Sequence, residues 1–111
     1  MIYITNYLRW HRKKSPLTQS DIAFLLDLPD YSNISRYEKG KRMPSIDLLI
    51  MYHFLFKVPI EAFFEQQSSD IFLKLKERLD ILINSLKRDN NSPNNLQRIK
   101  YLEEVIIRLN T

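Results

Sequence analysis

The chain has no cysteine, which excludes disulfide bonds and thiolate metal sites and fits a reducing cytoplasm, where we expect the protein to work. It has a single glycine, Gly40, so a glycine-rich phosphate loop is impossible. Its two histidines, His11 and His53, have no second ligand at metal-binding spacing and no nucleophile–base–acid set around them. No stretch approaches the roughly 20 apolar residues of a membrane helix. We therefore expect no metal, no cofactor, no membrane contact and no enzymatic activity.

What the chain does contain is enough for a folded core and for two clusters of positive charge. Its 111 residues suit one compact domain, or a small domain with an appendage, and 44% of them are hydrophobic. The net charge of +4 is mild, so bulk charge argues only weakly for nucleic acid. The local clusters are better evidence for nucleic-acid binding, although by themselves they are about equally compatible with two solvent-exposed helix ends. They consist of Arg9, Arg12, Lys13 and Lys14, and of Arg36, Lys39, Lys41 and Arg42.

Apolar spacing and helix-end residues predict five helices in residues 1–65. The first is expected over about 3–14. The second begins after Thr18, whose partner in a capping box is Asp21, and runs to the Leu28-Pro29 step, with Leu25 and Leu26 on its buried side. The third is expected over 31–39, after an Asp30 cap and before Gly40, which suits the left-handed backbone that often follows a helix. The fourth is expected over 46–56, and a short fifth runs from Pro59 to about residue 64.

The remaining residues predict a separate helical element. Residues 66–69 are expected to form a short linker. Apolar residues then alternate spacings of three and four on both sides of a polar 89–95 loop, in which Ser92 is a cap and Pro93 is the first helical residue. We therefore expect an antiparallel helical hairpin over residues 70–111. Its seam would contain Phe72, Leu75, Leu79, Leu82 and Leu86, and then Ile99, Leu102, Ile106 and Leu109.

Residues 18–44 are the most informative segment, because two short helices and a turn are followed by a basic loop. A unit of this size can place the end of one helix in a DNA groove. The segment resembles the lambda-repressor/Cro-like (XRE) helix-turn-helix family, and the resemblance extends over about residues 4–64. It is carried by Thr18-Gln19, Ile22-Ala23, Leu26, Leu28, Ile34-Ser35, Tyr37-Glu38, Gly40, Arg42 and Pro44, and then by Leu49, Tyr52, Phe56, Val58 and Phe63.

The resemblance implies an all-α, five-helix DNA-binding domain over residues 1–65, with its third helix in the major groove. The base-reading residues would be Tyr31, Ser32, Asn33 and Arg36, and the phosphate contacts Gln19, Lys39, Lys41 and Arg42. Arg12 and Glu38 match a structural ion pair. Tyr31 could instead pack over the turn, and the Asn33 amide could be spent on local capping.

Two features depart from the family pattern. Asp27 stands where the family usually has glycine, and the segment between Leu28 and Ile34 is one residue longer than usual. We place the extra residue at Pro29, before the third helix, which keeps the outward face of that helix in phase.

The fourth helix and the tail suggest an interface. Leu48, Met51 and Leu55, with Tyr3, Tyr7 and Trp10, predict more apolar surface than a bare five-helix domain buries, and His53 is expected to pack in the core. We expect the hairpin to cover part of this surface and to form a homodimer contact; the alternative is a hairpin packed within its own chain.

The resulting hypothesis is a regulator that binds double-stranded DNA as a dimer, with repression favoured. One alternative is the antitoxin of a toxin–antitoxin pair, with residues 70–110 gripping a protein partner. Another is a protein-bridging transcription cofactor, which the cationic face of the third helix disfavours.

Overall fold

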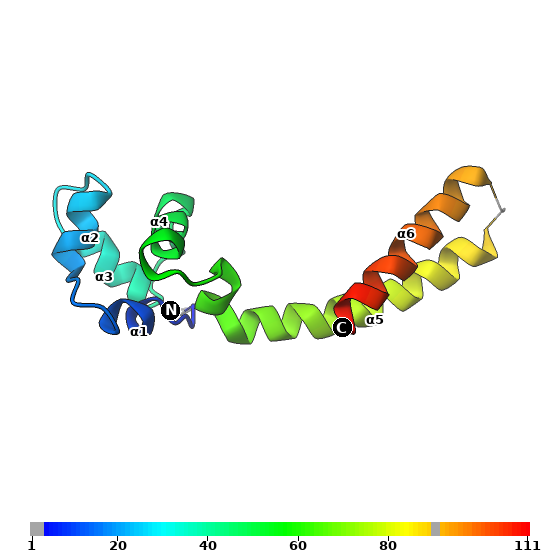
Figure 1. Ribbon diagram of the computed structural model, residues 1–111, viewed down its shortest axis with the longest axis horizontal. Helices are drawn as coiled ribbons and strands as arrows, with labels where there is room; N and C mark the ends of the chain where they lie inside the picture. The colour runs from blue at the N-terminus through cyan, green and yellow to red at the C-terminus, as the bar shows by residue number, and fades with distance from the viewer. Residues whose placement is uncertain (1–3, 90–91) are drawn as a thin grey trace. The chain divides into compact units, whose positions relative to one another are not determined.

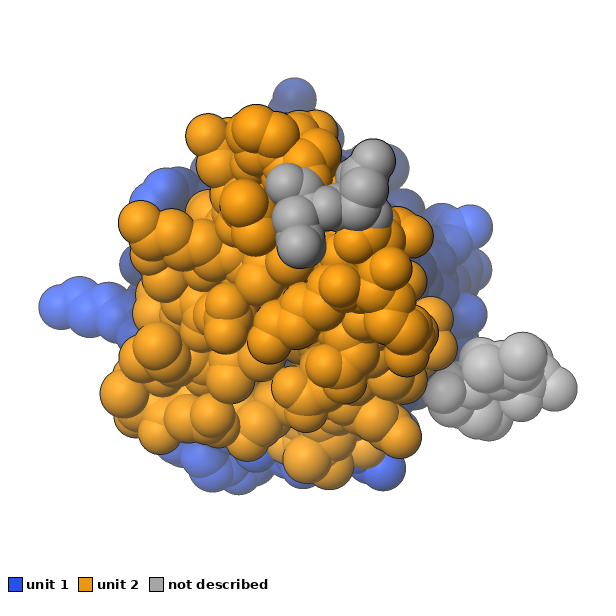
Figure 2. Space-filling view, turned by 90° about the vertical axis from the view of Figure 1, so that its right-hand side faces the viewer, with its two compact units in different colours: residues 1–68 blue, residues 69–111 orange. Residues whose placement is uncertain are grey.

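The computed structural model describes residues 4–89 and 92–111, and within these residues the regular structure is entirely helical, as expected (Figure 1). The chain forms two compact units, residues 1–68 and 69–111 (Figure 2). The elements are α1 (Leu8–Lys13), α2 (Gln19–Leu25), α3 (Ser32–Glu38), α4 (Ile46–Phe56), the 3₁₀ helix η1 (Ile60–Phe64), α5 (Glu65–Arg88) and α6 (Pro93–Leu109).

The core of the first unit takes a fully buried side chain from each of its first five elements: Leu8, Ile22, Ile34, Tyr52 and Phe63, with Leu48 as a second contribution from α4. Each short helix thus buries one narrow apolar stripe, which is how helices of one or two turns become stable in a protein. The expected five-helix arrangement is confirmed, with a 3₁₀ helix as its fifth member.

The first helix is shorter than expected: α1 begins at Leu8, whereas the apolar spacing predicted a start near residue 3, which lies outside the described residues. Backbone groups before Leu8 bond to distant parts of the chain. The Ile4 N–H donates to the Gly40 carbonyl at 2.7 Å, and the Tyr7 N–H donates to the Phe63 carbonyl at 2.8 Å. The Asn6 side chain accepts from the Leu8 N–H at 3.0 Å, which satisfies a donor at the start of the helix.

The α2–α3 turn is confirmed in outline and differs in detail. Thr18 and Asp21 form the predicted capping box, but α2 ends at Leu25 because Asp27 adopts a left-handed backbone, with φ of 57°. Asp27 thereby takes the conformation for which the family uses glycine, and aspartate is among the residues that tolerate it. Leu25 is consequently on the surface, 48% exposed, and not on the buried side as expected.

The expected break at residues 66–69 is absent, because α5 runs without interruption from Glu65 to Arg88. In its first turns, the Gln67 side-chain amide donates to the Thr5 carbonyl at 2.6 Å and the Ser68 hydroxyl donates to the Glu61 carbonyl at 3.2 Å. Glutamine and serine are compatible with a helix, so a polar stretch alone did not distinguish a linker from a solvated helical turn.

The second unit contains a hairpin formed by α5 and α6, with Ser92 and Pro93 in the predicted roles at the start of α6. Its core joins Ile83 and Leu86 of α5 to Ile99 of α6, flanked by Leu102 and Ile106. The predicted seam was therefore wrong in part. Ile83 takes the inward position, and three residues of the predicted seam are left exposed: Phe72, Leu75 and Leu82.

The apolar surface of α4 also differs from the expectation. Leu48 and Tyr52 face the core, and this phase turns other apolar side chains outward. Phe54 is 73% exposed, and an open groove beside it is lined by apolar residues of α2 and α4 together with Asp27 and Asp47. His53 lies outside the core, contrary to expectation, and its Nδ1 is 2.8 Å from the Val58 carbonyl oxygen, to which it can donate.

Candidate nucleic-acid interface

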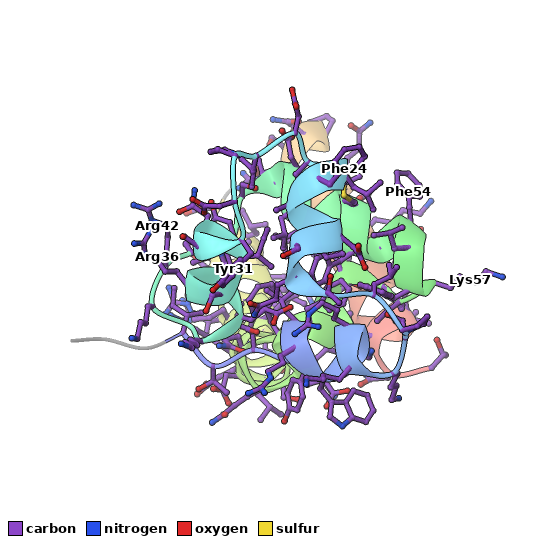
Figure 3. The ribbon with its side chains drawn as sticks, turned by 90° about the vertical axis from the view of Figure 1, so that its left-hand side faces the viewer. Phe24, Tyr31, Arg36, Arg42, Phe54 and Lys57 are labelled. Atoms are coloured by element: carbon purple, nitrogen blue, oxygen red, sulfur yellow. The ribbon has the colours of Figure 1, made fainter. Side chains whose placement is uncertain are left out.

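Helix α3 presents a polar outer face whose phase agrees with the sequence prediction. Ile34 is fully buried and Tyr37 packs against the core, whereas Ser32 and Arg36 are exposed. Tyr31 stands just before the helix and is 53% exposed, pointing to the same side of the domain as Arg36 (Figure 3). Pro29, where the sequence places the extra residue, lies in the turn before α3, which begins at Ser32.

The start of α3 is fixed by Asp30, one residue further from the helix than an ordinary N-cap. Its carboxylate accepts from the Ser32 N–H at 2.8 Å. That hydrogen bond, with a second one from the Ser32 side chain, lowers the pKa of Asp30 below its usual value. An ionised carboxylate at this end also suits the helix dipole.

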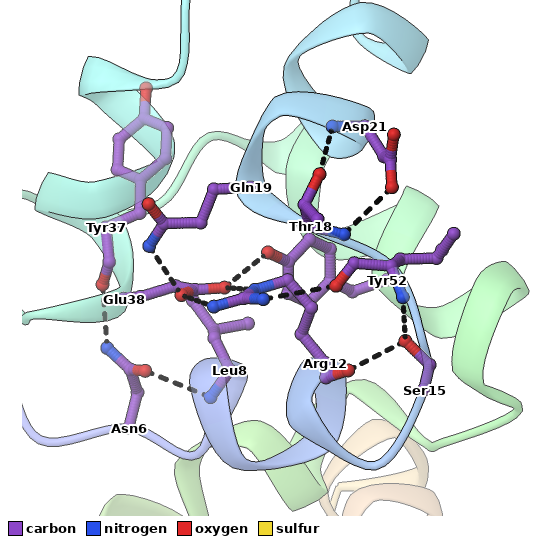
Figure 4. A network of polar contacts seen from close by, with 11 residues as sticks. Asn6, Leu8, Arg12, Ser15, Thr18, Gln19, Asp21, Tyr37, Glu38 and Tyr52 are labelled. Carbon is purple, nitrogen blue, oxygen red and sulfur yellow. Dashed lines mark hydrogen bonds and ion pairs between the residues drawn. The ribbon is translucent and has the colours of Figure 1, made fainter.

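The end of α3 is held by a buried polar network around Glu38 (Figure 4). Arg12 donates to both carboxylate oxygens, from Nε to Oε2 at 2.7 Å and from Nη2 to Oε1 at 2.9 Å, so the expected Arg12–Glu38 ion pair is present and bidentate. Gln19 donates from Nε2 to Oε1 at 2.9 Å, and the Tyr52 hydroxyl donates to Oε2 at 2.8 Å. Four helices are thereby joined at one carboxylate.

The protonation of this network follows from its contacts. Burial alone would raise the pKa of Glu38, but the hydrogen bonds from Arg12, Gln19 and Tyr52 and the charge of Arg12 outweigh it and lower the pKa. Burial raises the pKa of Tyr52, and the charge of Glu38 raises it further. The carboxylate is therefore ionised and the phenol neutral near neutral pH. The sequence did not predict Tyr52 as a polar partner, because nothing in its spacing distinguishes it from a core residue.

Gln19 therefore braces α3 through Glu38. A side-chain amide has two N–H groups, and the bond to Glu38 uses one of them. The second is left for another acceptor, such as the phosphate contact that the resemblance implied.

A cationic cleft of about 480 Å³ lies between α1, α2 and α3, and Gln19 is one of its lining residues. Lys39 lines it too, together with Arg9 and Lys13, two residues that the site prediction omitted. The signal for them was the basic cluster of residues 9–14. The four residues of this cluster do not all line the cleft as free cations. Arg12 is paired with Glu38, and the Lys14 ammonium lies over the Trp10 ring, 3.4 Å from its centroid.

The basic loop after α3 is not a single phosphate clamp. Lys39 faces the cleft, whereas the Arg42 guanidinium returns to α3 and donates from Nη1 to the Asn33 side-chain oxygen at 3.1 Å. Arg36 donates to the same oxygen at 3.3 Å. Lys41 is exposed, and its backbone N–H donates to the Arg36 carbonyl at 3.0 Å.

The comparison with protein families gives one match, in which the helix-turn-helix family model HTH_3 spans residues 8–63. This chain belongs to the lambda-repressor-like (XRE) helix-turn-helix family. No curated protein and no solved structure matches it.

Membership places the interface in a family of DNA-binding regulators, so this helix-turn-helix protein is a DNA-binding regulator. Within residues 4–89 and 92–111, no helix combines the length and the hydrophobicity needed to cross a membrane. In the same residues, no three side chains of histidine, cysteine, aspartate or glutamate gather where they could hold a metal ion.

Proposed function

We propose that this helix-turn-helix protein reads double-stranded DNA by base sequence and regulates transcription, with α3 in the major groove. The observation that carries the proposal is Arg36, an exposed cation on the outer face of a helix that is fixed at both ends. Only the major groove shows a distinct pattern of donors and acceptors for every base pair, and an arginine there pairs bidentately with guanine.

The other residues have supporting roles in this proposal. Tyr31 and Ser32 contact base edges beside Arg36. Phosphate groups are held by Gln19, Lys39 and Lys41, and we add Arg9 and Lys13 because they line the same cleft as Gln19. Contacts to phosphate give affinity and register but carry no sequence information.

The proposed working state is a homodimer formed through the hairpin. Phe72, Leu75 and Leu82 lie on one stripe of α5 at spacings of three and seven, and they are 37%, 41% and 41% exposed, whereas Leu79 on the same stripe is buried. A stripe of this kind, left partly uncovered by α6, suits pairing with a second hairpin. A dimer would read two half-sites about one DNA turn apart, and occlusion of a promoter makes repression the favoured outcome.

The same uncovered stripe supports a second candidate. An antitoxin would use it to hold a toxin while the helix-turn-helix domain regulates their shared promoter. In both cases we propose a cytoplasmic protein without enzymatic activity or cofactor.

The test is selection of binding sites from a random duplex-DNA pool at near-physiological salt, with full-length wild type, Arg36→Ala and a control, Arg88→Ala. Arg88 is exposed at the end of α5 and is part of neither the α3 face nor the apolar stripe. We expect wild type and Arg88→Ala to recover a two-fold-related motif, and Arg36→Ala to lose about 10- to 100-fold in affinity for it, with the guanine preference gone. Recovery of the same motif by Arg36→Ala would overturn the assignment.

A further inference from the structure

Arg42 was expected to clamp a phosphate, yet its side chain converges on the recognition helix. Arg36 and Arg42 both donate from Nη1 to Oδ1 of Asn33, at 3.3 and 3.1 Å. The two cationic groups are therefore within two hydrogen-bond lengths of each other, on the side of the domain to which Tyr31 also points (Figure 3). A residue that bound a phosphate at the edge of the groove would be expected to point away from the α3 face.

Bringing two guanidinium groups together costs electrostatic energy unless an anion or a strongly dipolar acceptor compensates them. In the described residues, the carboxylate that forms an ion pair is Glu38, and its partner is Arg12. Asp30 is close enough for the charge of Arg36 to lower its pKa, but they form no ion pair. The pair is thus held by a neutral amide oxygen, which leaves its positive charge available to a ligand.

Asn33 uses the oxygen that adenine recognition would need. Bidentate contact with adenine requires the amide oxygen as acceptor and the amide nitrogen as donor together. The oxygen already accepts two N–H groups, which matches its two lone pairs. Each guanidinium gives one of its five N–H groups to Asn33, so each retains an edge with two donors.

We propose that Arg36 and Arg42 form a paired guanine-reading site, with Asn33 as the residue that positions both guanidinium groups. The proposal rests on the proposed function and replaces two expectations for that interface: Arg42 reads a base and does not clamp a phosphate, and Asn33 does not read adenine. Successive bases of one strand are about 3.4 Å apart, so the spacing of the pair suits guanines at neighbouring positions or two steps apart. Each operator half-site should therefore carry two closely spaced guanines.

The experiment repeats the duplex-pool selection with full-length Arg42→Lys, Asn33→Ala and Lys41→Ala, each checked for wild-type helicity and melting temperature. Arg42→Lys keeps the charge and loses the two-donor fork. We expect it to lose the preference for one guanine, with about a 10-fold loss of affinity for the wild-type motif and an unchanged salt dependence. Asn33→Ala should weaken the preference at both guanines and at no adenine.

Lys41→Ala is the matched control, because it removes a neighbouring exposed cation. It should weaken binding to all sequences and reduce the salt dependence while the motif stays the same. The inference is overturned if Arg42→Lys recovers the full wild-type motif, or if Asn33→Ala loses an adenine preference. A wild-type selection with no motif would instead overturn the proposed function, and the inference with it.

Discussion

At the scale of single residues, Glu38 is the side chain that connects the helices around α3. Its carboxylate accepts four hydrogen bonds, from Arg12, Gln19 and Tyr52, and so connects α3 to α1, α2 and α4. A buried ion pair is weak evidence for net stability, but removal of one partner is costly because the other charge stays buried without compensation. The network thus makes the position of α3 depend on one ionised group.

This dependence predicts how stability changes in acid. The pKa of Glu38 is lower in the folded chain than in the unfolded chain, so its contribution is complete above the unfolded value of about 4.3 and is lost as pH falls through the folded value. We expect urea unfolding to show Glu38→Gln destabilised by about 3–5 kcal/mol at pH 7, with a difference from wild type that shrinks below about pH 4.3.

Two further variants separate the network from general effects of acid. Tyr52→Phe keeps the carboxylate and removes one hydrogen bond, so it should cost about 1.5–3 kcal/mol and move the acid-induced loss to higher pH. Glu104→Gln changes an exposed carboxylate on α6 and should match wild type throughout. The explanation would be wrong if wild type and Glu38→Gln lost stability in parallel below pH 4.3.

At the scale of elements, helix ends set by nearby side chains were predictable from the sequence, and ends set by distant backbone groups were not. Thr18 with Asp21, and Ser92 with Pro93, act within a few residues of their own position. The start of α1 is decided by hydrogen bonds to Gly40 and Phe63, which no local pattern encodes.

The candidate site also has features that local sequence patterns predicted and features that they did not. The outer face of α3 followed from the phase of its inward residues, and the Arg12–Glu38 pair followed from the family pattern. The sequence did not give the convergence of Arg42 on Asn33, because it depends on the path of a loop nine residues further along the chain. Nor did it give the cleft to which Arg9 and Lys13 belong, because that requires the packing of three helices.

Gly40 lies just after the end of α3 and also makes a long-range backbone contact with residue 4. The effect of adding a single methyl group at this position can therefore be predicted. The φ of Gly40 is +76°, and a Cβ there would overlap the Ile4 carbonyl oxygen. Gly40→Ala should therefore destabilise the domain by about 2–4 kcal/mol, because left-handed backbone strain adds to loss of the contact with residue 4. Thermal unfolding measures the cost.

Faster amide exchange at Ile4 would show that the same contact has been lost, because the Ile4 N–H donates to the Gly40 carbonyl. Ser20→Ala, an exposed change within α2, serves as the control. An unchanged melting temperature in Gly40→Ala would mean that the loop relaxes without cost, contrary to this account.

At the scale of the whole molecule, the proposed DNA-reading groups lie in the first unit and the uncovered apolar stripe in the second. The core of the hairpin is small: it joins three buried residues and two that flank them, and Leu79 of α5 is buried beside it. A helical pair with so little buried area gains stability when a second copy covers its exposed side. Dimerisation would then join two DNA-binding domains, which increases their specificity for paired half-sites.

This coupling predicts the result of sedimentation velocity on the full-length protein. We expect a dimer at tens of micromolar for wild type and for Lys74→Ala, a change at an exposed position beside the stripe. Leu75→Lys should weaken association by at least about 100-fold, because a two-fold interface loses the buried leucine twice. It should also lower affinity for a two-half-site duplex much more than for a single half-site. A wild-type monomer under these conditions would reject the dimer, and the stripe would then be the surface for the protein partner of the antitoxin alternative.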